Sequence, residues 1–140
     1  MKSILLLALR ATTGALLIIW GTIKAMEPAR SVRISDGLYG GTLSAEALQV
    51  PLGIAEIGLG VLVVAGLFRA ITYPAQAAVL IIGALPLWKY LIDPLGAWLL
   101  TVETRQYLFF PTTTIVVATL ILIAFKEYDT LSLDRMLRKK

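Results

Sequence analysis

Four long apolar segments alternate with polar connections along the chain. They cover residues 4–23, 48–68, 75–92 and 108–125, and each is 18 to 21 residues long. About 20 apolar residues in a helix span the hydrocarbon core of a bilayer, and a helix satisfies its own backbone hydrogen bonds there. The pattern predicts an all-α integral membrane protein, with a four-helix transmembrane bundle over residues 1–125 and a basic cytoplasmic tail over residues 126–140.

The connections predict how the helices are arranged. The second connection, around residues 69–76, is tight and makes the second and third helices antiparallel neighbours. Four spans place both termini on one side, which then carries Lys2, Arg69 and five tail cations, seven against five on the other side. Because Lys and Arg concentrate on the cytoplasmic side, we expect an N-in, C-in protein of a bacterial or archaeal plasma membrane.

The first and third connections are long, and both fall on the outer side in this arrangement. Four aromatic residues gather there: Trp88, Tyr90, Trp98 and Tyr107. Trp and Tyr are enriched where a membrane meets water, so an interfacial belt accounts for most of these rings. A lid over a ligand site is the alternative interpretation.

One stripe of the first helix is cationic and rich in glycine. At about 100° per residue, this stripe contains Arg10, Gly14, Leu17, Gly21 and Lys24. By the same arithmetic the second helix carries a matching stripe of Gln49, Gly53, Glu56, Gly60, Val63 and Leu67. Glycine on a transmembrane helix allows close approach of another backbone, so the two stripes are expected to face each other.

A lone charge at the centre of a bilayer costs at least ~2.5–3.5 kcal/mol. The Cα atoms of Arg10 and Glu56 should differ in depth by roughly 8 Å, which an extended Arg and a Glu can bridge. The sequence therefore predicts an Arg10–Glu56 ion pair, with Lys24 at the outer mouth of the same groove. The predicted polar groove consists of Arg10, Gly14, Lys24, Gly53 and Glu56.

The predicted pair has two interpretations. It could be a buried bridge that only fixes the register of two helices. Alternatively, it could line a cavity in which Glu56 accepts a proton and Arg10 anchors a carbonyl or an anion. Glu56 is thus the candidate catalytic residue, with no catalytic role assigned by any motif.

The amino-acid composition limits the reactions and cofactors that this chain could support. Of the 140 residues 58% are hydrophobic, and the chain contains no Cys and no His. These absences exclude thiol chemistry, disulfides and His-ligated haem in this chain, and no metal-ligand or nucleotide-binding motif is present. We therefore expect no cofactor held covalently or by metal ligands; redox chemistry would need an organic carrier such as a quinone, or a partner protein. Five of the thirteen Lys and Arg residues lie in residues 126–140, which is typical of contact with anionic lipid rather than nucleic acid.

Two segments carry a family resemblance. "LRATTGALLIIWGTIKA", residues 9–25, is similar to the opening helix of DoxX-like membrane proteins: an Arg, a Gly four residues on, then a Gly and a Lys near the helix end. "GIAEIGLGVLVVAGLFRAITYPA", residues 53–75, resembles the second helix of that family. The resemblance implies a compact four-helix bundle. It also implies a connection with membrane oxidoreductase complexes, including small subunits of thiosulfate:quinone oxidoreductase, or with the assembly of other membrane proteins.

Three functions remain open on the sequence. The first is an accessory or quinone-interacting subunit of a membrane oxidoreductase. The second is a non-catalytic structural or assembly subunit that binds a larger membrane complex, or its own copies. The third is a transporter with Glu56 as the coupling acid, for which four helices give little room.

Overall fold

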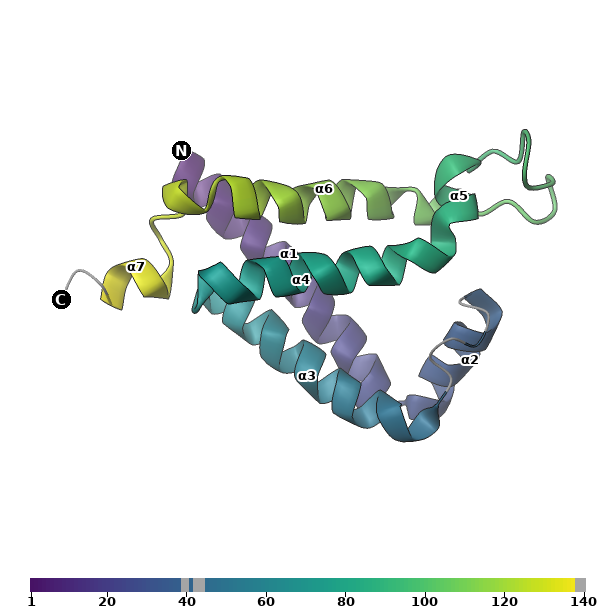
Figure 1. Ribbon diagram of the computed structural model, residues 1–140, viewed down its shortest axis with the longest axis horizontal. Coiled ribbons are helices and arrows are strands. Elements are labelled where there is room, and N and C mark those ends of the chain that lie inside the picture. The colour runs from purple at the N-terminus through teal and green to yellow at the C-terminus, as the bar shows by residue number, and fades with distance from the viewer. Residues whose placement is uncertain (39–40, 42–44, 138–140) are drawn as a thin grey trace.

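A computed structural model describes residues 1–38, 41 and 45–137, apart from the side chain of Leu38. The elements in chain order are α1 (Lys2–Met26), α2 (Pro28–Leu38), α3 (Glu46–Ala65), α4 (Arg69–Ala84), η1 (Leu85–Leu87), α5 (Trp88–Ile92), η2 (Tyr107–Phe109), α6 (Pro111–Ala124), η3 (Lys126–Tyr128) and α7 (Leu133–Leu137). No strand occurs in the described ranges, which confirms the predicted all-α class (Figure 1).

Within the described ranges, four helical segments are long and apolar enough to cross a membrane: Lys2–Met26, Glu46–Ala65, Arg69–Ile92 and Tyr107–Ala124. They coincide with the four predicted segments, although the third begins six residues earlier than expected, because Pro74 lies inside α4 instead of in a loop. Pro74 is the sixth residue of α4; transmembrane helices tolerate an internal proline because neighbouring groups satisfy the backbone carbonyl that it leaves free. Pro86 instead coincides with a turn of 3-10 helix between α4 and α5.

Helices α1 and α3 are antiparallel and pack through glycine. A Cβ atom added at Gly21 would lie 2.6 Å from the Gly53 carbonyl oxygen, and one added at Gly60 would lie 2.6 Å from the Gly14 carbonyl oxygen. These distances leave no room for a side chain, so the two backbones touch along the seam. The expectation that the two glycine-bearing stripes face each other is confirmed.

Helices α4 and α6 complete the bundle (Figure 1). The core between α1, α3, α4 and α6 contains Leu6, Val63, Tyr73 and Leu122, near the end where the first and last described segments meet. Ser3 at the start of α1 donates a hydrogen bond to the carbonyl oxygen of Tyr128, 3.1 Å away. Large apolar residues such as Ile54, Ile82 and Val117 remain exposed, as expected for helices that face lipid.

Residues 126–137 fold back over this end of the bundle. Asp129 and Ser132 are fully buried. The Asp134 carboxylate accepts the backbone N–H groups of Phe68 and Arg69, each at 2.9 Å, and so caps the N-terminus of α4. The described part of the predicted tail is therefore packed against the bundle and includes the short helix α7; residues 138–140 lie outside the described residues.

Candidate functional site

Arg10 does not pair with Glu56, so the predicted ion pair is wrong. Its guanidinium Nη1 donates to both oxygens of Asp129, at 3.0 and 2.9 Å. Nε donates to the carbonyl oxygen of Val64 at 3.2 Å, and Nη2 donates to that of Leu131 at 2.8 Å. The Arg10 side chain is 3% exposed and the Asp129 side chain 0%. Every nitrogen of this guanidinium thus donates at least one hydrogen bond within the protein.

Asp129 is the centre of a buried polar cluster. Its carboxylate also accepts the hydroxyl hydrogen of Tyr73 at 2.5 Å. Arg69 Nη1 donates to the carbonyl oxygens of Lys126 and Asp129, at 2.9 and 2.8 Å. The cluster therefore links α1, α4 and the C-terminal segment, and its geometry is that of a structural clamp.

Glu56 pairs instead with Lys24, whose ammonium contacts its Oε1. The register of α1 against α3 explains why Glu56 pairs with Lys24 and not with Arg10. Gly14 lies opposite Gly60 and Val64, and Gly21 lies opposite Gly53 and Ile57. Extending that register separates Arg10 from Glu56 by about ten residues, roughly 15 Å along the helices, and Lys24 from Glu56 by about four residues, roughly 6 Å.

The direction of the side chains increases the difference between the Arg10–Glu56 and Lys24–Glu56 separations. Each Cα–Cβ bond in a helix tilts toward the helix N-terminus. Because α1 and α3 are antiparallel, Arg10 and Glu56 reach away from each other, whereas Lys24 and Glu56 reach toward each other. Lys24 extends back into the bundle rather than out toward the nearer end of α1.

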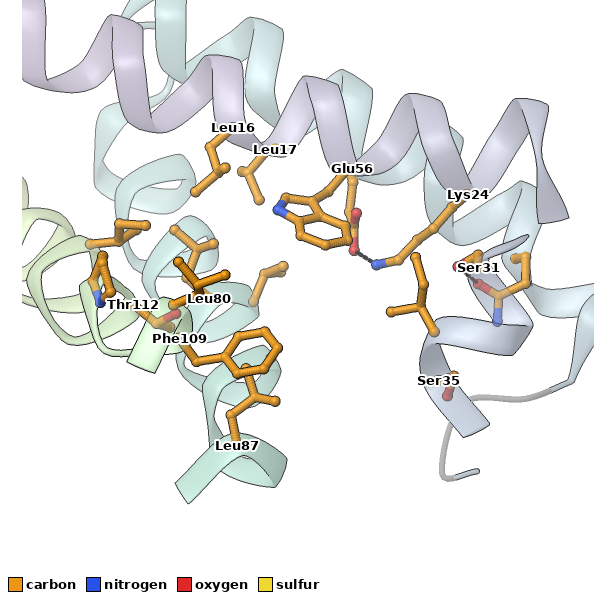
Figure 2. Close-up of a pocket in the computed structure, with 18 residues that line it drawn as sticks. Leu16, Leu17, Lys24, Ser31, Ser35, Glu56, Leu80, Leu87, Phe109 and Thr112 are labelled. Atoms are coloured by element: carbon orange, nitrogen blue, oxygen red, sulfur yellow. Dashed lines mark hydrogen bonds and ion pairs between the residues drawn. The ribbon is translucent and has the colours of Figure 1, made fainter. Parts of the chain in front are cut away.

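The Lys24–Glu56 pair lies in the wall of a cavity of about 400 Å³. Helices α1, α4 and α6 supply an apolar lining, and Figure 2 shows Leu80, Leu87, Phe109 and Thr112 across the cavity from the ion pair. Leu16 and Leu17 belong to α1 and form part of its contribution to the lining. A mostly apolar cavity of this size with a few polar groups at one end is typical of a site for a small amphipathic molecule.

Helix α2 closes the polar end of this cavity. It contributes Ser31, Ile34 and Ser35 to the lining, and the Ser31 hydroxyl donates to Oε1 of Gln49 at 2.7 Å. Gln49 is 2% exposed and comes from the first turn of α3. The predicted long first connection is thus partly helical, and α2 forms a wall of the cavity; residues 39–40 and 42–44 lie outside the described residues.

Two buried side chains near this region have polar atoms without a hydrogen-bond partner among the described residues: Oε2 of Glu56, and both Oε1 and Nε2 of Gln76. Gln76 is fully buried on α4. It precedes Val79, Leu80 and Gly83 of the cavity lining by three, four and seven residues, so it lies on the same helical stripe, one turn beyond them.

The sequence-predicted site is therefore divided between three places. Lys24 and Glu56 line the cavity, Gly14 and Gly53 form the α1–α3 seam, and Arg10 belongs to the Asp129 clamp. Gln49 shares a helical stripe with Glu56 and could have been included in the predicted polar groove for that reason. The signal in the sequence for Asp129 was its acidic side chain within a C-terminal segment that is rich in Lys and Arg.

Asp93 organises the connection between α5 and η2. Its carboxylate accepts the backbone N–H groups of Ala97, Trp98, Leu99 and Leu100, at 2.6 to 3.0 Å. Burial raises the pKa of Asp93, but these four donors outweigh it and hold the pKa far below the ordinary value. Lys89, four residues before Asp93, forms no ion pair with it; the Lys89 ammonium lies 5.7 Å from the ring centroid of Trp88. Leu95, Trp98 and Val102 of this connection are exposed.

No group of three or more His, Cys, Asp or Glu side chains that could hold a metal ion occurs within the described residues. Comparison of the chain with protein-family models, curated proteins and solved structures finds no match. Functional inference therefore depends on the cavity and on the ion pair in its wall.

Proposed function

We propose that the chain is a DoxX-like, multi-pass protein of a bacterial or archaeal plasma membrane, with both termini cytoplasmic, and that it binds a quinone-type molecule in this cavity. In this role it is an accessory subunit of a membrane oxidoreductase complex. The observation that carries the proposal is the Lys24–Glu56 pair in the wall of a mostly apolar cavity between membrane-spanning helices.

The chemistry of the lining supports a flat, lipid-soluble ring with a polar edge. The apolar side chains that face the cavity, among them Leu16, Leu17, Leu80 and Phe109, suit the ring and its tail. Lys24 can donate to a ring oxygen, while Glu56 holds the ammonium in place and can exchange a proton with the ligand. The sequence contains no Cys and no His, so the electrons come from a partner subunit.

The orientation rests on charge. Lys2, Arg69, Lys126 and Arg135 lie at the end of the bundle where the start of α1 contacts residues 126–137. With the three further cations at positions 138–140 of the sequence, the positive-inside tendency favours this end as the cytoplasmic one. The cavity and the Asp93-centred connection then lie toward the outer side.

A binding test can use two glycines. At both Gly83 and Gly58 an added Cβ would meet nothing within 4 Å, but only Gly83 lines the cavity. We expect duroquinone to bind the wild-type protein and the Gly58→Leu variant in lipid nanodiscs, and Gly83→Leu to abolish binding by filling the cavity. Equal binding to all three proteins would overturn the proposal, as would no binding to any of them.

A second candidate function is that of a non-catalytic assembly subunit. It is favoured by the exposed Leu95, Trp98 and Val102 on a connection that Asp93 holds in one conformation. In that case Trp98→Ser would remove a membrane protein that copurifies with the wild type, whereas Gly83→Leu would leave it bound. Mass spectrometry of complexes purified in native lipid distinguishes the two functions.

A further inference from the structure

The ion pair in the cavity wall has hydrogen-bonding capacity left on both partners. A lysine ammonium has three N–H donors and an ionised carboxylate accepts at about four lone-pair sites. One ammonium–carboxylate contact, from Lys24 Nζ to Glu56 Oε1, joins the two residues. Oε2 of Glu56 is buried without a partner among the described residues. The pair thus offers a donor and an acceptor side by side to a molecule in the cavity.

The charge of the lining limits what can bind. Lys24 and Glu56 are the charged residues among those that line the cavity, and they neutralise each other. A charged molecule placed in this apolar site would lack a free counter-charge, and an unpaired buried charge is strongly disfavoured. The cavity therefore suits a neutral molecule.

The opposite wall carries a second polar group. Figure 2 shows Thr112, from α6, on the side of the cavity away from Lys24 and Glu56. The Thr112 hydroxyl can donate or accept. A ring that carries oxygen atoms at opposite positions has the same order of polar and apolar parts.

We infer that the cavity selects a head group with a hydroxyl, so that of a quinone and its hydroquinone it binds the hydroquinone more tightly. This inference rests on the proposed function. A phenolic hydroxyl accepts a hydrogen bond from Lys24 and donates one to Glu56. A quinone carbonyl can only accept; it leaves the carboxylate without a donor and brings a second electron-rich oxygen close to it.

The test compares three probes on the same methylated ring: durohydroquinone, duroquinone and the dimethyl ether of durohydroquinone. Binding is measured by calorimetry under nitrogen, with the full chain in lipid nanodiscs. One well-placed hydrogen bond to a charged group corresponds to about tenfold or more in affinity. We expect durohydroquinone to bind at least about tenfold more tightly than duroquinone, and the ether, which retains oxygen acceptors but has no donor, to lose this advantage.

The Glu56→Gln variant provides a second comparison. The Gln amide can donate to a carbonyl, so the preference should shrink or reverse in favour of duroquinone. If this variant does not fold, the comparison between durohydroquinone and its ether on the wild-type protein decides the question alone.

The possible failures are distinguishable. Equal or tighter binding of duroquinone, lost in Gly83→Leu but kept in Gly58→Leu, would overturn the hydroxyl preference and leave the proposed function standing. Binding of none of the three probes, or binding unaffected by Gly83→Leu, would overturn both.

Discussion

Arg10 and Asp129, separated by 119 positions in the chain, form a buried ion pair in which one guanidinium nitrogen donates to both carboxylate oxygens at 3.0 and 2.9 Å. The pair ties the first helix to the segment that follows the last one. The cation inside the first apolar segment is thus explained by the C-terminal segment instead of by the charged residue of the neighbouring helix.

The Asp129→Asn variant should be strongly destabilised. It leaves the buried Arg10 guanidinium without a full counter-charge, and breaking a buried pair in this way typically costs about 3–5 kcal/mol. Unfolding by denaturant in detergent micelles measures the change. The control is Glu27→Gln, since the Glu27–Arg30 pair is more than half exposed on both side chains and should change stability by no more than about 0.5 kcal/mol. Similar losses in the two variants would contradict the role of the Asp129 clamp.

Gly21→Ala should destabilise the bundle, because its Cβ would lie 2.6 Å from the Gly53 carbonyl oxygen. Forcing two packed helices apart costs about 1–3 kcal/mol. Gly58→Ala is the matched control on α3, where an added Cβ meets nothing within 4 Å, and it should be neutral or slightly stabilising because alanine favours helix. Thermal unfolding followed by circular dichroism measures both, and a neutral Gly21→Ala would show that the seam can open at little cost.

The Lys24–Glu56 pair should show strong coupling in a double-mutant cycle. Lys24→Met alone leaves a partly buried carboxylate without its cation, at a cost of about 1–3 kcal/mol. The double variant Lys24→Met, Glu56→Met removes both charges, and its stability should return close to that of the wild type. Denaturant unfolding of the four proteins gives the coupling energy. Losses that simply add would mean that the two side chains do not interact in solution.

Asp93→Asn should loosen the outer connection. An amide oxygen cannot replace a carboxylate that accepts four backbone N–H groups, so hydrogen exchange at Ala97, Trp98, Leu99 and Leu100 should accelerate about tenfold or more. Glu103→Gln, an exposed change in the same connection, is the control. Unchanged exchange in Asp93→Asn would show that other contacts hold these residues.

The same carboxylate predicts a pH dependence. The pKa of Asp93 is lowered in the folded state, so its contribution is fully present above the unfolded pKa of about 3.9 and is lost as pH falls through the lowered folded pKa. Protection of this connection, corrected for the intrinsic exchange rate, should stay constant from neutral pH to about pH 4 and decline only in stronger acid. A loss of protection between pH 7 and 5 would contradict the assignment.

The sequence predicted the four spans because they depend on local properties. Length and hydropathy decide whether a segment can cross a bilayer, and both can be read along the chain without knowing its partners. The glycine-rich faces of α1 and α3 were predictable for the same reason, since helical periodicity places Gly14 and Gly21 on one side of their helix. Even Glu56 and Lys24 were recognised as members of one groove.

The pairing of the charges was decided by the tertiary structure. A helical wheel gives the face on which Arg10 lies, but the register of α1 against α3 and the opposite tilt of side chains on antiparallel helices determine which charges meet. The return of residues 126–137 over the bundle, which brings Asp129 to Arg10, depends on contacts between segments more than 100 positions apart. The cavity beside Glu56 likewise depends on how α2, α4 and α6 pack. Sequence by itself determined the spans and their glycine faces, because these follow from the residues of each helix. The tertiary structure alone decided the partners of the charges and the volume of the cavity, because both require segments distant in the chain to be placed in three dimensions.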